Sequence, residues 1–311
     1  MAMLTYENAS KKPEEFQSLT GLSVEEFDQL YLEVEQRYPA VEDRRLDRPN
    51  RRRRRGAGHK FRHTLRNRLL LTLTWLRVYP SYRVLGLLFN LDKSNVCRNL
   101  KIMLPLVQQV TDQVLPDLET DSGEDDLETI LAKFPGLRAI VDATEQRTRR
   151  PKDNAVQGAY YSGKKKAHTI KTQVVVNEEG RPCHVSDSVP GSQHDLTLER
   201  QSQVNEKLPP QVKMMGDKGY QGLQNDNAKR TVELPTRKPR GQELTDEQTT
   251  ANRALAVTRI VVEHVLAHIK IFQVLYQVYR HSRGGAYNRI FRVVVGLVCR
   301  HIDRRLAAAS P

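Results

Sequence analysis

The feature that most constrains the fold is a change in sequence character near the middle of the chain. Residues up to about 116 carry apolar side chains at helical spacing, whereas β-branched residues in strand-length runs dominate after Leu137. Between them lies the acidic stretch DLETDSGEDDLETI, which begins at Asp117 and contains no basic residue. Such a stretch is typical of a linker, with a mimic of duplex DNA as the alternative. We therefore predict a helical domain over 1–116, a linker over 117–134 and a mixed α/β domain over 135–311.

The overall charge indicates the class of partner. Among 311 residues, 50 are Lys or Arg and 37 are Asp or Glu, which gives a net charge of +13. An excess of this kind favours nucleic acid as a partner, although lysines also serve solubility. No apolar run approaches the roughly 18–20 residues that span a bilayer, and no signal segment opens the chain. We expect a cytoplasmic protein without a membrane partner, in which Cys97, Cys183 and Cys299 are reduced core residues.

A run of arginines over residues 44–55 contains almost nothing apolar. It cannot form a core, so we predict a mobile basic loop. A solvated surface loop is one interpretation, and a contact to DNA phosphates without sequence preference is the other. The candidate phosphate contacts are Arg51, Arg52, Arg53, Arg54 and Arg55.

The residue pattern over about 64–112 predicts a helix-turn-helix. A first helix ends near Pro80, a short second helix covers about Tyr82–Phe89, and Ser94 is the expected N-cap of a third. The apolar positions of the third helix are Val96, Leu100 and Leu104. Its predicted outer face consists of Asn95, Arg98, Asn99 and Lys101. A helical hairpin need not bind DNA, but the basic neighbour favours this reading of the face.

Two aspartates follow short apolar runs in the second half. Asp142 ends the run LRAIV, and Asp217 follows VKMM and precedes KGYQG. Each could be a turn-forming residue, because aspartate often ends strands. Each could also present a carboxylate at the edge of a sheet. We also expect a hairpin turn over Asn177–Gly180.

Glu263 lies in a long helix that we predict over about Thr245–Val278. At about 100° per residue, Arg259, Glu263 and Lys270 fall on one stripe within about 40° of each other. A surface ion pair is the ordinary reading of a Glu with an Arg four residues away. Because residues 260–269 are otherwise almost entirely apolar apart from two histidines, we expect this helix to be largely buried.

Together, Asp142, Asp217 and Glu263 would supply only carboxylate oxygens. Such ligands suit Mg²⁺ or Mn²⁺ rather than zinc. Two such ions about 3.5–4 Å apart can activate a water or a 3′-hydroxyl and stabilise a leaving oxygen. Without cations, three carboxylates in one place repel each other.

At these positions the chain resembles the DDE transposases of bacterial insertion sequences, specifically insertion-sequence family five, and the related Harbinger transposases of eukaryotes. The similar sequence motifs, in chain order, are VDATE, YSGKKKAHTIKTQVVV, PGSQHD, GDKGYQG and the helix signature of Arg259, Glu263 and Lys270. LTGLSVEEFDQL and LTWLRVYPSYRVLGLLFNLDKSNVCRNL resemble the family's helix-turn-helix region. The resemblance covers roughly residues 19–280.

The resemblance implies a ribonuclease-H-like catalytic domain with flanking helices behind an all-α helix-turn-helix domain. It also implies metal-dependent cleavage of double-stranded DNA at terminal inverted repeats and transfer of the 3′-hydroxyl to target DNA. A homodimer that joins two ends at the bacterial nucleoid is expected. The implied metal ligands for about two Mg²⁺ or Mn²⁺ ions are Asp142, Asp217 and Glu263.

The resemblance further implies DNA contacts by Arg259 and Lys270 and by the lysine run Lys164, Lys165 and Lys166. Asp195 is ambiguous: it would fix a loop or His194, with a role as metal ligand as the alternative. The sequence departs from many relatives at Ala256, where they carry Tyr three residues before the Arg.

Two further functions stay open on sequence grounds. A domesticated DNA-binding regulator with a silent nuclease would keep the helix-turn-helix. The presence of Asp142, Asp217 and Glu263 argues against this alternative. A metal-dependent phosphatase or repair nuclease would use the same chemistry. The basic helical region argues against a small-molecule phosphatase.

Overall fold

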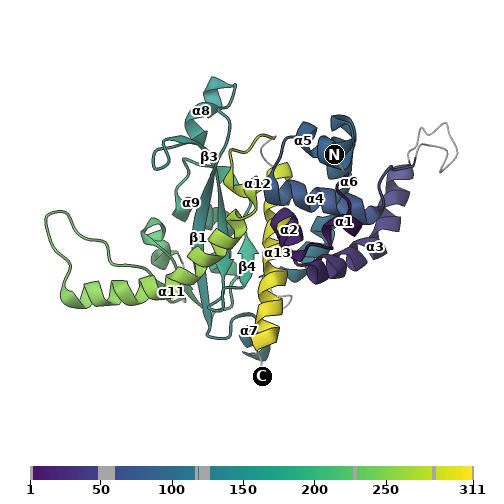
Figure 1. Ribbon diagram of the computed structural model, residues 1–311. Helices are drawn as coiled ribbons and strands as arrows, with labels where there is room; N and C mark the ends of the chain where they lie inside the picture. The colour runs from purple at the N-terminus through teal and green to yellow at the C-terminus, as the bar shows by residue number, and fades with distance from the viewer. Residues whose placement is uncertain are drawn as a thin grey trace. The chain divides into compact units, whose positions relative to one another are not determined.

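The computed structural model describes residues 3–47, 60–115, 118, 127–226, 230–281 and 285–309. The chain divides into two compact units, one helical and one built around a sheet (Figure 1). The helical unit contains the residues up to Val114 together with Ile271–Val274 and Arg289–Leu297. The sheet unit contains Leu115–Lys270, Leu275–Asn288 and the residues from Val298 onward. The domain boundaries drawn from the sequence stay predictions.

The helical unit forms around a fully buried apolar core. Ser23 begins its long N-terminal helix with the predicted capping box, in which the Ser23 side chain accepts from the Glu26 N–H and Glu26 accepts from the Ser23 N–H. Phe16 and Phe27 pack edge to face at 5.3 Å. The helices are α1 (Tyr6–Ala9), α2 (Pro13–Thr20), α3 (Val24–Leu46), α4 (Leu65–Val78), α5 (Tyr82–Phe89), α6 (Lys93–Thr111) and the 3₁₀ turn η1 (Asp112–Val114).

The helix-turn-helix prediction is confirmed in its helices and wrong in two details. Helix α5 begins and ends where the sequence placed it, and α6 follows after a short turn. The N-cap of α6 is Asp92 rather than Ser94, because Asp92 is extended and the helical backbone already begins at Lys93. Asn99, predicted to face outward, is 4% exposed and is bound to Arg68.

Two C-terminal segments complete the helical unit. Phe272 lies against Gly21, and Arg77 donates to the Ile271 carbonyl at 2.7 Å. Gly296, on the last helix α13 (Gly285–Ala309), sits so close to Thr111 that an added Cβ would lie 2.5 Å from the Thr111 Cβ. This close approach explains why the position requires glycine.

The sheet unit contains a mixed sheet with flanking helices, which confirms the predicted fold class. The strand order is β2-β3-β1-β6-β7, with β4 and β5 also paired to β3. Strands β1 and β3 are antiparallel, whereas β1, β6 and β7 run parallel. The strands are β1 (Arg138–Arg147), β2 (Tyr161–Ser162), β3 (Ala167–Val176), β4 (Pro182–Val185), β5 (Val189–Pro190), β6 (Lys213–Met215) and β7 (Val232–Glu233).

The hairpin at Asn177–Gly180 is confirmed, since the Gly180 N–H donates to the Asn177 carbonyl between β3 and β4. Strand β1 is longer than predicted. It continues past Asp142 to Arg147 because β3 pairs with it along its length. Asp142 therefore lies within a strand, not at its end.

Helices flank this sheet: α7 (Leu127–Lys133), α8 (Asn154–Tyr160), α9 (Asp195–Ser202), α10 (Val204–Lys207), α11 (Asp246–Lys270) and α12 (Gln273–Tyr276), with 3₁₀ turns η2 (Lys218–Tyr220) and η3 (Leu223–Asn225). Helix α7 occupies the end of the predicted linker, and Ile130 and the following Phe134 are buried in the core. The helical residues between Asp195 and Lys207 form two helices, because Gln203 is left-handed between them.

Helix α11 is not largely buried as expected. Its inward face consists of Val262, Val265, Leu266 and Ile269, whereas Val257 is 72% and Ile260 is 47% exposed. The apolar sequence of α11 over residues 260–269 therefore does not mean that the helix is buried on all sides. No helix within the described ranges is long and apolar enough to cross a membrane.

Candidate active site

Strand register brings Asp142 and Asp217 together. Strands β1 and β6 are parallel, with Ile140 opposite Met215, so two residues further along each chain Asp142 is level with Asp217. Strand β6 ends at Met215, but the Asp217 backbone is still extended. Neighbouring strands lie about 4.8 Å apart, and residues in register point to the same face. The pairing thus presents two carboxylates side by side.

A tight turn fixes the Asp217 side chain. Its Oδ1 accepts a hydrogen bond of 2.7 Å from the Gly219 N–H and caps the 3₁₀ turn η2. An added Cβ at Gly219 would lie 2.9 Å from that oxygen and 2.5 Å from Asp195 Oδ2. The glycine therefore leaves room for two carboxylates around one backbone amide.

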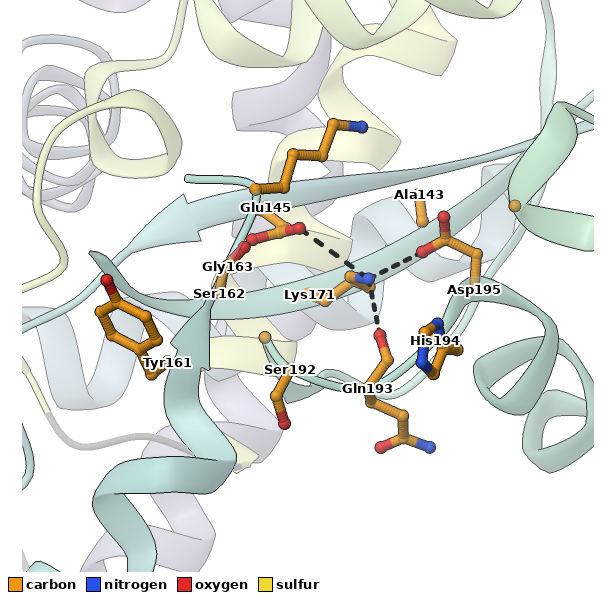
Figure 2. Close-up of a pocket in the computed structure, with 13 residues that line it drawn as sticks. Ala143, Glu145, Tyr161, Ser162, Gly163, Lys171, Ser192, Gln193, His194 and Asp195 are labelled. Atoms are coloured by element: carbon orange, nitrogen blue, oxygen red, sulfur yellow. Dashed lines mark hydrogen bonds and ion pairs between the residues drawn. The ribbon is translucent and has the colours of Figure 1, made fainter. Parts of the chain in front are cut away.

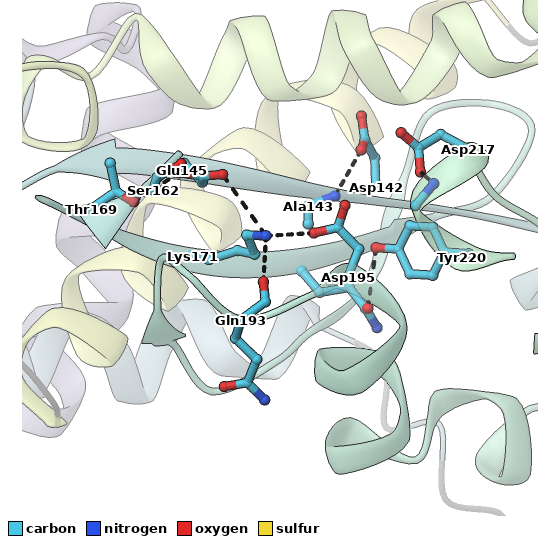
Figure 3. A network of polar contacts seen from close by, with 12 residues as sticks. Asp142, Ala143, Glu145, Ser162, Thr169, Lys171, Gln193, Asp195, Asp217 and Tyr220 are labelled. Atoms are coloured by element: carbon cyan, nitrogen blue, oxygen red, sulfur yellow. Dashed lines mark hydrogen bonds and ion pairs between the residues drawn. The ribbon is translucent and has the colours of Figure 1, made fainter. Parts of the chain in front are cut away.

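Electrostatics confirm that three acids share this environment. The pKa of Asp142 is raised to about 6: burial is the largest cause, the charges of Asp217 and Asp195 act in the same direction, and the Ala143 N–H and Arg259 oppose them. The buried Tyr220 phenol has its pKa raised by burial and then by the charges of the same three aspartates. The structure thus brings Asp142, Asp217 and Asp195 together around Tyr220 (Figure 3).

Asp195 is held by a lysine that the sequence analysis did not single out. Lys171 Nζ lies 2.8 Å from Asp195 Oδ1, 2.6 Å from the Gln193 carbonyl and 3.8 Å from Glu145 Oε1 (Figure 3). His194, which precedes Asp195 in the chain, is exposed and is the N-cap of α9, without a side-chain capping bond. The available signal was a lone cation within the apolar strand HTIKTQVVV.

Helix α11 packs against β1 and carries the third predicted acid. Arg259 acts on Asp142. The pKa of Lys270 is lowered by burial and by Lys165, whereas Asp142 and Glu145 raise it. Glu263 shares their helical stripe but is exposed, and it is not among the charges acting most strongly on Asp142. Its place in the site stays a prediction.

A pocket of about 360 Å³ opens beside the acids (Figure 2). Its wall combines carboxylates, hydroxyls, an aromatic ring and closely approaching glycine backbone. The lining residues are Ala143, Glu145, Tyr161, Ser162, Gly163, Lys164, Lys171, Gly191, Ser192, Gln193, His194, Asp195 and Gly219.

The lysine run lies in the turn between β2 and β3, where Lys164, Lys165 and Lys166 are all exposed. Lys164 lines the pocket. Lys165 affects Lys270 on α11, so basic side chains from two elements border the acidic region.

In the helical unit, Asn95, Arg98 and Lys101 are exposed on the first turns of α6, as predicted. Arg98 donates to Asn95 Oδ1 at 2.9 Å. The arginines 51–55 lie outside the described residues, and their role stays a prediction.

The donor set fits a hard divalent cation, because Asp142 and Asp217 offer adjacent carboxylates and Asp142 carries repulsion that a cation would relieve. Within the described residues, no three Asp, Glu, His or Cys side chains are arranged closely enough to hold an ion.

Comparison with known proteins defines the class. The family model "DDE superfamily endonuclease" matches residues 141–298, and "Helix-turn-helix of DDE superfamily endonuclease" matches residues 64–112. The chain belongs to the DDE superfamily endonucleases, among the transposases of insertion sequences.

A curated relative is the "Probable transposase for insertion sequence element IS702" of Microchaete diplosiphon. It is 32% identical over 232 residues, which cover 73% of this chain and 78% of the relative. No solved structure gives a significant match.

Proposed function

We propose that this chain is an active transposase that cuts double-stranded DNA at the terminal inverted repeats of its element and joins the freed 3′-hydroxyl to target DNA. The observation that carries the proposal is the register of Asp142 and Asp217 on parallel strands, with the pKa of Asp142 raised to about 6. Two carboxylates placed this close are costly for the fold unless a cation joins them.

Asp142, Asp217 and Glu263 would hold about two Mg²⁺ or Mn²⁺ ions. Glu263 is assigned because Arg259 and Lys270, which bracket it on its helical stripe, both interact electrostatically with Asp142. When bound, such ions lower the pKa of a coordinated water or hydroxyl and stabilise the leaving oxygen.

In the cleavage step, water adds to the phosphorus and the bond to the 3′-oxygen breaks, which leaves a 3′-hydroxyl. In the transfer step, that hydroxyl attacks a target phosphorus and displaces the target 3′-oxygen. Arg259, Lys270 and the lysines of the β2–β3 turn would bind the strand's phosphates beside the acids, and the pocket would accept the polar groups of the strand.

The exposed face of α6 would read base edges in the major groove through Asn95, Arg98 and Lys101. Bringing two element ends together favours a homodimer. The substrate, chromosomal DNA, would place the protein at the bacterial nucleoid.

The test uses the full chain and DNA that carries the element ends. Asp142→Asn, Asp217→Asn and Glu263→Gln should each lower cleavage at least about 10³-fold, because each loses metal-bound stabilisation of several kcal/mol. Gel-shift affinity should stay unchanged. Glu247→Gln, in the exposed first turn of the same helix, is the matched control and should cut normally.

Full activity in any of the three variants would remove that residue from the metal site. Binding without nicking by the wild-type protein, in either Mg²⁺ or Mn²⁺, would instead identify a regulator.

A further inference from the structure

Lys171 is a charged side chain in a place where a charge is costly. It lies in β3, and its side chain is only 9% exposed. Removing an ammonium from water is unfavourable unless oxygens replace the lost hydration. Here Asp195 Oδ1, the Gln193 carbonyl and Glu145 Oε1 surround Nζ.

The two carboxylates bound by Lys171 also lie against other groups. Glu145 Oε2 accepts a hydrogen bond of 2.7 Å from the Thr169 hydroxyl, which fixes it on the pocket wall. Asp195 Oδ2 faces Gly219, where an added Cβ would lie 2.5 Å away. Asp195 is therefore placed with Oδ1 on the ammonium and Oδ2 beside the Gly219 turn.

A chain of contacts leads from Lys171 to the proposed metal ligand. Lys171 binds Asp195, Asp195 abuts Gly219, and the Gly219 N–H donates to Asp217 Oδ1. Asp195 also acts electrostatically on Asp142. It is thus near both ligands, yet its Oδ1 is engaged by an ammonium.

We propose that Lys171 is a positioning residue: it holds Asp195 against the Asp217 turn, supplies a positive charge to the acidic cluster, and keeps Asp195 from becoming a metal ligand. The part of this inference that concerns metal rests on the proposed function. Its prediction is that Asp195 supports the site but does not coordinate.

The first experiment measures Mn²⁺ binding to the full chain without DNA, by the electron paramagnetic resonance signal of free Mn²⁺. Asp195→Asn should bind Mn²⁺ with wild-type stoichiometry, whereas Asp217→Asn should lose binding. Loss of an ion in Asp195→Asn would show that Asp195 is a ligand and would overturn the proposal.

Lys171→Met should bind Mn²⁺ about tenfold more tightly, because the cluster becomes more negative by one charge and Asp195 is released. The double change Lys171→Met with Asp195→Asn should return the affinity close to wild type. DNA cleavage by Lys171→Met should fall about tenfold, because the Asp217 turn loses its support. Lys213→Met, at an exposed lysine on β6 of the same sheet, is the control. Unchanged or weaker Mn²⁺ binding in Lys171→Met contradicts the charge role.

A second measurement needs no metal. Hydrogen exchange of the Gly219 and Tyr220 amides in Lys171→Met should be about tenfold faster, while the hairpin amides at Asn177–Arg181 stay protected and report intact folding. If the wild-type protein binds no Mn²⁺, the proposed metal site is refuted. The exchange measurement still tests whether Lys171 positions the Asp217 turn. Unaltered exchange at the turn would overturn it.

Discussion

Both units contain a buried cation in a polar network, and Arg68 and Lys171 are surrounded differently. In the helical unit, Arg68 donates to Asn99 Oδ1 at 2.8 Å and to the Tyr38 hydroxyl at 2.8 Å, and it stacks 3.7 Å from the centre of the Phe61 ring. Burial lowers its pKa. In the sheet unit, Lys171 is bound by the carboxylates of Asp195 and Glu145. The first cation has neutral partners, and the second has anionic ones.

This difference separates two uses of buried charge. Arg68 fixes the directions of three helices, because its partners Tyr38 and Asn99 lie on α3 and α6 while it lies on α4. Its planar fork suits several acceptors at once. Lys171 is a compact point charge that offsets an acidic cluster. Arg68 thus serves geometry, as does Arg230 of the sheet unit, which donates only to backbone carbonyls, whereas Lys171 serves charge balance.

The largest stability effect should come from replacing Arg68, the cation that orients the helices. Arg68→Met leaves Asn99 and Tyr38 without a buried donor, which should lower the free energy of unfolding of the helical unit by about 3 kcal/mol. Arg68→Lys should recover little, since one ammonium cannot reproduce the fork. The fluorescence of Trp75, the sole tryptophan and a buried residue of α4, reports on this unit in a urea titration.

The control for this prediction is Arg83→Met, at an exposed position of α5, which should leave the midpoint unchanged. A wild-type midpoint in Arg68→Met would show that the polar network does not fix these helices.

An effect of at most the same size, and of opposite sign, should follow from removing an acid of the sheet unit. The folded-state pKa of Asp142 is raised from 3.8 to about 6, so the folded protein binds this proton more tightly than the unfolded chain. The stability that this proton contributes is present below about pH 4 and is lost as the pH rises to about 6. In chelator, Asp142→Asn should therefore stabilise the protein by up to about 3 kcal/mol above pH 6.

Calorimetry between about pH 4 and pH 8 checks this sign. A gain for Asp142→Asn that shrinks with rising pH would contradict the raised pKa. The matched variant is Asp153→Asn, because Asp153 caps the N-terminus of α8 and its carboxylate accepts from Ala155, so its replacement should give no such gain.

The two units should also contribute differently to DNA affinity, the helical unit to sequence preference and the sheet unit to binding of any DNA. Arg98→Ala on α6 should weaken binding to the element end by about tenfold, with a smaller effect on unrelated DNA, because base contacts carry specificity. Lys165→Ala, in the β2–β3 turn, should weaken both DNAs equally and reduce the salt slope by about one. Titrations at several salt concentrations separate the two. Equal losses on both DNAs for Arg98→Ala would remove α6 as the reading element.

Local patterns predicted much of this fold. The capping box at Ser23, helix α5, the hairpin at Asn177–Gly180 and the order of helices and strands are set by neighbours within a few residues. The pairing of Asp142 with Asp217 was anticipated only as proximity, since its register depends on which strands are adjacent. Lys171 was missed for the same reason: its partners Glu145 and Asp195 come from distant segments.

The errors had physical causes as well. Apolar spacing shows that a helix has an inward face but not how much of its circumference is covered, so α11 was expected to be more buried than it is. Asn99 looked like a surface residue because polar side chains usually are, and only a buried arginine 31 positions earlier explains its burial.

The smallest expected effect tests the corrected start of α6 against the confirmed start of α3. Ser23 caps α3 through a side-chain hydrogen bond to the Glu26 N–H at 3.2 Å, so Ser23→Ala should cost about 1 kcal/mol. Ser94 lies one residue inside α6 and is exposed, so Ser94→Ala should change stability by less than about 0.5 kcal/mol. Trp75 fluorescence follows both, because both helices belong to the helical unit. A loss in Ser94→Ala equal to that in Ser23→Ala would return the N-cap to Ser94 and shift the first turn of the proposed reading helix by two residues.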